Sequence, residues 1–393
     1  MAEPKLRFKD EQGREYPEWK RQKLGNIFVQ TNNYSTLDDK KELYSLTVEN
    51  GITPKTERYD RSFLVKKNDK FKIVHKNEFV YNPMNMTIGA VGYNNLRKDI
   101  IVSGYYVVMK SNNVSTNEYW YNWLKSPKTI RLFKQKATGS LIEKQRIQFS
   151  TFEKIKADIP SLPEQQKIAD FLTSYDRMID TQSQRVEAMK TRKKGLLQKI
   201  FSQEIRFKDE QGRDYHEWEN NMFGNVIQRK SKTALSTNDL PGVEYEDIIS
   251  GSGRLNKNIY EKQNGKKGIV FSKGDVLYGK LRPYLKNWLL PNFHGVAIGD
   301  FWVLSSSLVI APFLYYFVQS DTFAQVTNKF IGTKMPRADW KLVQAMIIKI
   351  PSLSEQQKIA DFLTAVDAQI KVEEKRLETM KTIKKGLLQQ MFI

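Results

Sequence analysis

Two stretches of the chain place apolar residues alternately three and four positions apart, which is the spacing of one face of a long helix. They cover residues 159–201 and 350–393. The first series is Ile168, Leu172, Tyr175, Ile179, Gln182, Val186, Met189, Lys193, Leu196 and Ile200. The second series is Ile359, Leu363, Val366, Ile370, Glu373, Leu377, Met380, Lys384, Leu387 and Met391. A mean spacing of 3.5 predicts a coiled-coil seam.

Both series are interrupted at the same two places, by Gln182 and Lys193 in one and by Glu373 and Lys384 in the other. Polar seam residues fix register at some cost in stability. If the helices run antiparallel with flush ends, Gln182 and Glu373 lie near the midpoint and near each other. We therefore predict that this pair sets the register of the two helices and hence the distance between the two domains that the helices separate. The alternative is that each helix packs on its own domain.

Longer repeats show that the chain consists of two tandem halves. Each half has a shared first segment, a middle of its own and a shared helical last segment. Ser161 and Glu164, like Ser352 and Glu355, predict a capping box at the start of each helix. The repeated pairs are residues 6–19 with 205–218, 159–173 with 350–364, and 189–201 with 380–392.

The middles resist alignment with each other but share a mixed pattern. Short alternating runs between Gly, Asn and Asp turns predict strands within Glu78–Asn82, Ser103–Lys110 and Lys267–Lys280. A helix is predicted over Asn117–Gln135 in one half and over Ala311–Phe330 in the other.

The fold class expected from these patterns is α+β. Two tandem mixed α/β domains, residues 1–158 and 202–349, are separated by the long helices 159–201 and 350–393. The helices are expected to pack as an antiparallel coiled coil with pseudo-twofold symmetry.

The net charge of the chain indicates the class of its binding partner. The 393 residues carry a net charge of +20, which favours a polyanionic partner, most often nucleic acid. No cysteine is present, so disulfides and cysteine-ligated metals are excluded, and a reducing cytoplasm is the expected location. Three scattered histidines do not suggest a metal cluster, and we expect no bound metal. The apolar stretch Val303–Val318 is interrupted by serines and a proline, so we interpret it as a strand and a helix and not as a membrane span.

Motifs for catalysis are weak. Gly274–Lys280 has P-loop spacing, but Leu281 stands where a magnesium-binding Ser or Thr belongs. Glu246–Gly253 imitates a glycine-rich cofactor turn without a surrounding βαβ pattern, and Tyr81–Asn85 lacks the second proline of an amino-methyltransferase tetrad. No set of Ser, His and Asp or of Cys and His can be assembled, so we expect a binding chain without catalytic residues.

Basic and aromatic residues gather instead in turn-like stretches. Arg and Lys bind guanine edges and phosphates, and Asn and Gln bind adenine edges. The candidate DNA-binding residues of the first half are Lys55, Arg58, Asn94, Asn95, Arg97, Ser140, Lys144 and Arg146. Those of the second half are Arg254, Asn256, Lys257, Lys280, Arg282, Tyr284, Lys286, Thr333, Lys334 and Arg337.

The duplicated plan and the phrases "IPSLPEQQKIADFL" and "MKTRKKGLLQKIF" resemble the specificity subunits of type I restriction–modification systems. The resemblance covers essentially the whole chain. It implies that each middle is a target recognition domain for one half of a split DNA sequence, and that the helices are a spacer. It implies two methyltransferase (modification) subunits, with S-adenosylmethionine, and two restriction/translocase subunits, with ATP and Mg, as partners. This chain would bind double-stranded DNA and no cofactor of its own.

Two alternatives stay open. The first is a stand-alone bipartite DNA-binding protein without restriction partners. The second is an enzyme whose active site the motif search does not recognise.

Overall fold

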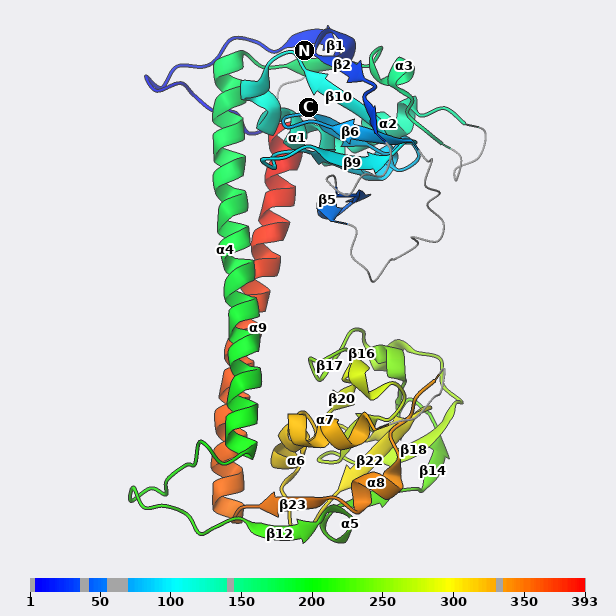
Figure 1. The fold of residues 1–393 in the computed structure, drawn as a ribbon, viewed down its shortest axis with the longest axis vertical. Coiled ribbons are helices and arrows are strands. Elements are labelled where there is room, and N and C mark those ends of the chain that lie inside the picture. Colours follow the sequence, from blue (N-terminus) through cyan, green and yellow to red (C-terminus); the bar gives the residue numbers. More distant parts are fainter. Residues whose placement is uncertain (1–3, 36–41, 55–69, 140–144, 330–334, 393) are drawn as a thin grey trace. The chain divides into compact units, whose positions relative to one another are not determined.

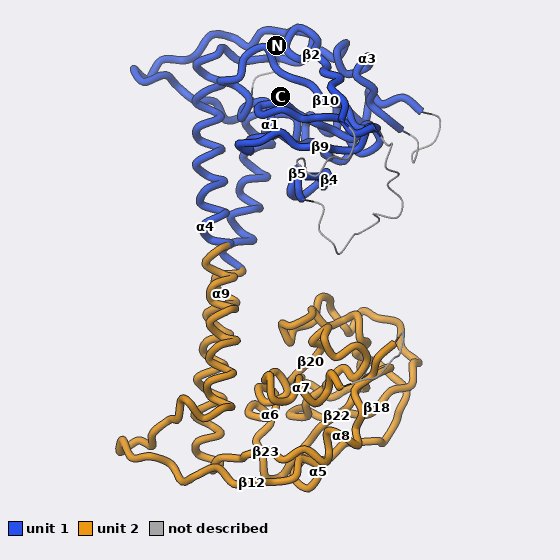
Figure 2. Tube along the Cα trace, viewed as in Figure 1, with its two compact units in different colours: residues 1–183, 375–393 blue, residues 184–374 orange. Residues whose placement is uncertain are grey.

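The protein was analysed as a computed structural model. The structure describes residues 4–35, 42–54, 70–139, 145–329 and 335–392. The chain divides into two compact units, Met1–Ser183 with Lys375–Ile393, and Gln184–Glu374 (Figures 1 and 2). Each unit therefore combines one mixed α/β domain with a part of both long helices.

The long helices are α4 (Leu162–Phe201) and α9 (Leu353–Met391). All twenty predicted seam positions are buried or half-buried, so the predicted seam is confirmed. In the second unit Arg185 pairs with Glu373 at 3.0 Å, and Lys193 pairs with Asp367 at 2.7 Å. Residue numbers rise along one helix as they fall along the other, so the helices pack antiparallel there.

The predicted capping box is wrong in the role of its glutamates. Glu164 is fully buried and accepts hydrogen bonds from Arg7 Nε at 2.9 Å and Trp19 Nε1 at 3.2 Å. Arg206 and Trp218 bind Glu355 in the same way in the second unit, at 2.9 and 3.1 Å. A buried carboxylate needs a cation or several donors, and the repeated first segment of each half supplies both. In each half, the hydrogen bonds from Arg and Trp to the glutamate connect the first segment to the start of the long helix.

The described residues of the first domain form four small sheets. In strand order they are β1 (Lys20–Lys23) with β11 (Lys156–Ile159); β2 (Phe28–Thr31), β10 (Val107–Ser111), β7 (Phe79–Tyr81) and β8 (Val91–Tyr93); β3 (Tyr34–Ser35), β6 (Phe71–Val74) and β9 (Ile100–Ser103); and β4 (Tyr44–Thr47) with β5 (Gly51–Pro54). The predicted strands within Glu78–Asn82 and Ser103–Lys110 are thus β7 and part of β10.

The second domain repeats this order, with one additional strand in its third sheet. Its sheets are β12 (Glu219–Met222) with β23 (Ile347–Ile350); β13 (Gln228–Lys230), β22 (Phe301–Ser305), β19 (Val276–Gly279) and β20 (Trp288–Leu289); β14 (Thr233–Leu235), β18 (Lys267–Phe271), β21 (Gly295–Ala297) and β15 (Gly242–Val243); and β16 (Ile248–Ile249) with β17 (Arg254–Leu255). The two middles therefore share a topology that their sequences do not display.

The single helix predicted in each middle is two helices. They are α1 (Asn117–Lys125) and α2 (Pro127–Lys136) in the first domain, and α6 (Ala311–Phe317) and α7 (Asp321–Thr327) in the second. Ser126 and Ser320 separate them, each extended and each accepting a backbone N–H of the following turn. Serine at an N-cap starts a new helix, and the proline after Ser126 disfavours helical backbone at that serine.

Short helices complete the domains: α3 (Phe149–Phe152), α5 (Phe223–Val226) and α8 (Trp340–Gln344). Val303–Val318 forms most of β22 followed by α6, as predicted. Among the described residues, no helix has the length and apolar character needed to cross a membrane.

The end of each long helix lies in a domain core. Phe392 is fully buried in the first unit, with its ring centroid 5.6 Å from that of Tyr119. In the second unit the ring of Phe201 packs on Phe313 and Phe317 at 5.4 and 5.5 Å. Phe201 and Phe392 belong to the repeated last segment, so the same element closes both cores.

Candidate nucleic-acid interface

Two predicted basic loops of the second domain lie side by side. The loop between β19 and β20, residues 280–287, runs against residues 335–338. The backbone N–H of Arg282 donates to Pro336 O at 2.7 Å, and that of Ala338 donates to Lys280 O at 2.8 Å. Leu281 and Arg337 form an antiparallel bridge. The structure therefore brings the candidates Lys280, Arg282 and Arg337 together.

One carboxylate joins the two loops. Arg337 Nε and Nη2 donate to the two oxygens of Asp300 at 3.1 and 3.0 Å, and Lys280 Nζ lies 3.7 Å from the same carboxylate. The hydrogen bond from Arg337 lowers the pKa of Asp300 below its usual range. Sequence reasoning missed Asp300, because only the charge pairing in space marks it.

The 280–287 loop is held in a conformation that side chains rarely adopt. Arg282 (φ 46°) and Lys286 (φ 56°) are both left-handed although neither is glycine. Residues in such conformations cluster at functional sites. Tyr284 between them is 51% exposed. The Arg282 Nε atom is buried and has no hydrogen-bond partner among the described residues.

The hairpin of β16 and β17 adjoins this loop. Gly251 N–H donates to Lys286 O at 2.9 Å, and Ser250 Oγ donates to Leu285 O. Arg254 on β17 pairs with Glu374 of α9 at 2.5 Å. The guanidinium of this candidate is thus already engaged by the long helix, which favours a role in fixing the domain to α9.

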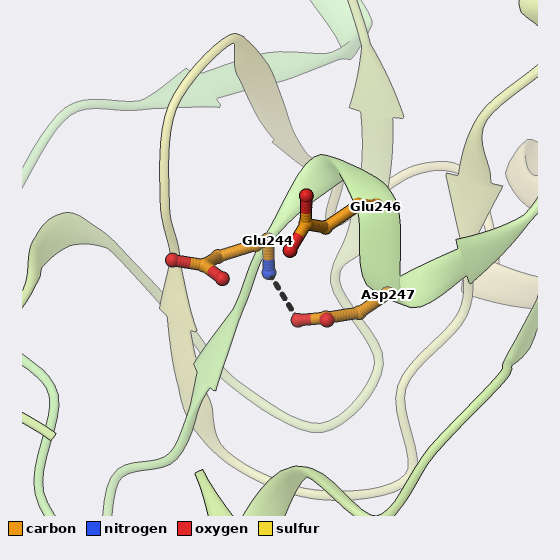
Figure 3. Close-up of side chains that lie close together, drawn as sticks. All are labelled: Glu244, Glu246 and Asp247. Atoms are coloured by element: carbon orange, nitrogen blue, oxygen red, sulfur yellow. Dashed lines mark hydrogen bonds between the residues drawn. The ribbon is translucent and has the colours of Figure 1, made fainter. Parts of the chain in front are cut away.

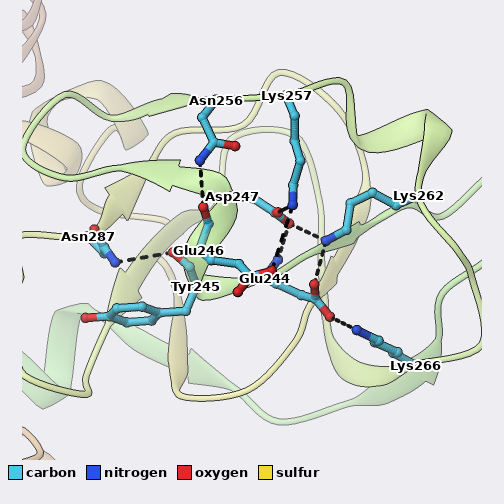
Figure 4. Close-up of polar contacts among 9 residues, drawn as sticks. All are labelled: Glu244, Tyr245, Glu246, Asp247, Asn256, Lys257, Lys262, Lys266 and Asn287. Carbon is cyan, nitrogen blue, oxygen red and sulfur yellow. Dashed lines mark hydrogen bonds and ion pairs between the residues drawn. The ribbon is translucent and has the colours of Figure 1, made fainter. Parts of the chain in front are cut away.

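Lys257 and Asn256 belong to a cluster built on three carboxylates, Glu244, Glu246 and Asp247 (Figure 3). Asp247 is fully buried and pairs with Lys257 at 2.8 Å, and Lys262 pairs with Glu244 at 2.8 Å and also with Asp247 (Figure 4). Lys262 lowers the pKa of Glu244 by hydrogen bonding. Lysine ammonium groups already neutralise these carboxylates, so the cluster orders the segment after β17.

In the first domain, the structure contradicts one candidate DNA contact, Asn94. Asn94 is fully buried; its Nδ2 donates to Val74 O at 2.9 Å and to Lys98 O at 3.1 Å, and its Oδ1 accepts from Leu96 N–H. Its amide holds the turn after β8 and has no surface left for a base. The neighbouring candidates Asn95 and Arg97 are exposed on that turn.

A loop of the first domain was missed altogether. Residues 82–90 join β7 to β8, as residues 280–287 join β19 to β20. Ile147 N–H donates to Pro83 O at 3.0 Å, so the half-buried candidate Arg146 lies beside this loop as Arg337 lies beside its own. Met84 and Ile88 are 42% and 50% exposed. The loop has no charged residue, and a search for basic stretches could not find it; the matching strand order is the signal.

Other candidates stay predictions. Gln182 belongs to the first unit and is 7% exposed. Glu373 belongs to the second unit and pairs with Arg185. The pairing of Gln182 with Glu373 stays a prediction. Six candidate DNA contacts lie outside the described residues: Lys55, Arg58, Ser140, Lys144, Thr333 and Lys334.

A family model described as "Type I restriction modification DNA specificity domain" matches residues 16–190 and again residues 215–382. The chain belongs to this family. The two matches coincide with the two halves, so the duplication seen in the strand orders is a duplication of the family's domain.

The chain is similar to known specificity subunits. The chain is 25% identical over 315 residues to the MjaVIII specificity subunit of Methanocaldococcus jannaschii, covering 74% of this chain and 73% of that protein. It is 25% identical over 194 residues to the HindI specificity subunit of Haemophilus influenzae, covering 45% and 41%.

Solved structures share the fold. A type I S subunit from M. genitalium superposes with a TM-score of 0.53 at 16% identity, covering 100% of this chain and 99% of that one. A structure of a type I restriction–modification system superposes with a TM-score of 0.58 at 15% identity, covering 96% and 98%.

Proposed function

We propose that this chain is the DNA-binding specificity subunit of a type I restriction–modification complex, and that it recognises a bipartite target with one domain for each half-site. The observation that carries the proposal is the repeated sheet order with unlike loops at equivalent places. A common scaffold fixes the loops, and loops on rigid scaffolds commonly carry recognition. Different loop chemistry then gives two different half-sites in one split target.

Repeated surface residues support two copies of one partner. Leu162 and Leu353 occupy the same position in the first turn of α4 and of α9, and they are 55% and 58% exposed. Exposed apolar side chains of this size at interfaces contribute through burial against a partner. We propose that each marks the docking surface of one methyltransferase subunit. S-adenosylmethionine, ATP and Mg would then be bound by partner subunits, and this chain alone would neither methylate nor cut DNA.

The deciding experiment maps methylated adenines across the genome of cells with and without this chain. A split motif should be methylated only when the chain is present. Unchanged methylation would exclude the proposal. Two candidate alternatives have their own readouts. A stand-alone DNA-binding protein would bind the split motif without co-purifying a methyltransferase. An enzyme would modify DNA in the absence of partner subunits.

The docking surfaces are tested by Leu162→Glu and Leu353→Glu. Each single variant should lose about one of two methyltransferase subunits in a native mass measurement, and the double variant should lose both, because a buried charge without a partner opposes association. Leu308→Glu is the matched control, since Leu308 is also 58% exposed but belongs to no repeated segment. Full occupancy in the double variant would contradict these surfaces.

A further inference from the structure

The guanidinium of Arg337 is fixed along one edge. Asp300 accepts from Nε at 3.1 Å and from one N–H of Nη2 at 3.0 Å. A guanidinium has five N–H donors in one plane. Three donors remain. Two of them, one on each Nη atom, project in parallel from another edge of the guanidinium, which Asp300 does not occupy. The arginine side chain is 49% exposed and the aspartate 26%, so the carboxylate is the more enclosed partner.

We propose that Arg337 recognises a guanine in the half-site of the second domain and that Asp300 is the positioning residue that directs its guanidinium. Two parallel N–H donors match the O6 and N7 acceptors that guanine presents in the major groove. Adenine places an amino donor where guanine has O6, so one of the two donors of Arg337 would face a donor. The inference rests on the proposed function, because it needs the second domain to contact DNA.

Backbone hydrogen bonds hold the segment around Arg337 against the facing loop. Hydrogen bonds of 2.7 and 2.8 Å join Pro336 to Arg282 and Ala338 to Lys280. The facing loop, residues 280–287, holds two non-glycine residues at positive φ. A side chain that is aligned in advance loses less entropy on binding. An exposed ion pair alone adds little to stability, so stability is a weak reason for this arrangement and alignment is a stronger one.

The test uses the chain in complex with its methyltransferase subunits, and the probe is a duplex DNA library with every position of the target varied. Arg337→Ala and Asp300→Asn should each lose discrimination at one G·C pair of one half-site, by roughly 5- to 150-fold for the arginine and by less for the aspartate. Arg337→Lys keeps the charge but not the paired donors, so it should lose the discrimination while the salt dependence of binding stays the same.

If Asp300 had only a structural role, its replacement would change the melting temperature. If Asp300 acts through Arg337, Asp300→Asn should add nothing to discrimination in the Arg337→Ala background, and melting temperatures should stay close to wild type. Asp209→Asn is the matched control, because Asp209 pairs with Arg213 at 2.7 Å on an exposed turn of the same unit. This control should leave every base preference unchanged.

The outcomes separate the two proposals. If the wild type selects a sequence and Arg337→Ala selects the same guanine with the same preference, the inference is overturned and the proposed function stands. An additive effect of Asp300→Asn in the double variant also overturns the positioning role. If the wild type selects a sequence that contains the guanine but directs no split methylation, the proposed function fails and the inference survives.

Discussion

The loops 82–90 and 280–287 occupy the same place in two copies of one sheet order, yet their chemistry differs. The first has no charged side chain and exposes Met84 and Ile88. The second carries Lys280, Arg282 and Lys286 within eight residues. A backbone hydrogen bond holds each loop against the neighbouring segment, from Ile147 N–H to Pro83 O in the first domain and from Ala338 N–H to Lys280 O in the second, while the loop side chains differ.

The difference assigns recognition, on the proposed function, to the loops. Cations gain affinity from phosphates and specificity from guanine, whereas apolar groups contact the methyl group of thymine. On the proposed function, the two domains would recognise their half-sites by different physical means from one scaffold.

The largest effect is expected in the cores. Phe392→Ala removes a fully buried ring and should destabilise the first unit by ~3–5 kcal/mol. Phe201→Ala removes a half-buried ring and should cost the second unit ~1–3 kcal/mol. Hydrogen exchange in α1 and in α6 measures the two units separately. Equal losses, or a loss that spreads to the other unit, would show that the two cores do not depend on the repeated segment in this way.

The next effect concerns the loops themselves. Replacing Lys280, Arg282 and Lys286 by Ala should reduce the slope of log K against log salt by up to ~2.7, because each phosphate contact contributes ~0.9. Replacing Met84 and Ile88 by Ala should leave the slope unchanged and alter preference in the other half-site only. Titration of DNA binding over a range of salt concentrations checks both. Equal slopes for the two variants would remove the distinction between the loops.

A smaller effect is expected from the lysines that interrupt the seam. Lys193 pairs with Asp367, which also accepts from Tyr316 at 3.0 Å, and Lys384 pairs with Asp176. Lys193→Asp should cost ~1–3 kcal/mol, and the exchange Lys193→Asp with Asp367→Lys should restore most of it. The Lys384–Asp176 pair is more exposed and should cost ~0.5–1 kcal/mol. Thermal unfolding checks the order of these losses; failure of the exchange to restore stability would assign Lys193 a role beyond charge.

The smallest effect is expected from Gln182 and Glu373. Changing both to Leu should raise stability slightly, since apolar seam residues pack better, and should loosen the preferred spacer between half-sites. The gain is reduced by loss of the Arg185–Glu373 pair. Methylation of a library with varied spacers measures the preference. Parental spacing without any gain in stability would place the register elsewhere in the seam.

Much of the scaffold was predictable from the sequence, because helices and strands leave periodic patterns. The seam positions of α4 and α9 and the strands β7, β10, β18 and β19 followed from spacing alone. The break at Ser126 was missed although a cap and a proline signal it locally. The equivalence of the two middles was hidden, since strand order depends on pairing between distant segments and not on side-chain identity.

The candidate site was less predictable. Residue type suggested that Asn94 faces outward, whereas its amide closes a turn with backbone groups of Val74 and Lys98. Asp300 and Arg337 are separated by 37 positions, and no local pattern links them. The role of Glu164 depends on Arg7, which is 157 positions away. Such pairings arise only when the chain has folded.

The position of Phe392 in the core of the first domain has a consequence for synthesis. Apart from Met391, the other buried residues of this core lie between Trp19 and Leu172, and they leave the ribosome long before residue 392. At ~5–20 residues per second the delay is roughly 10–50 s. During that time the apolar site around Tyr119 lacks its natural filling. The nascent chain therefore carries an incomplete domain for most of its translation, and a chaperone that covers this site would protect it until the last helix arrives.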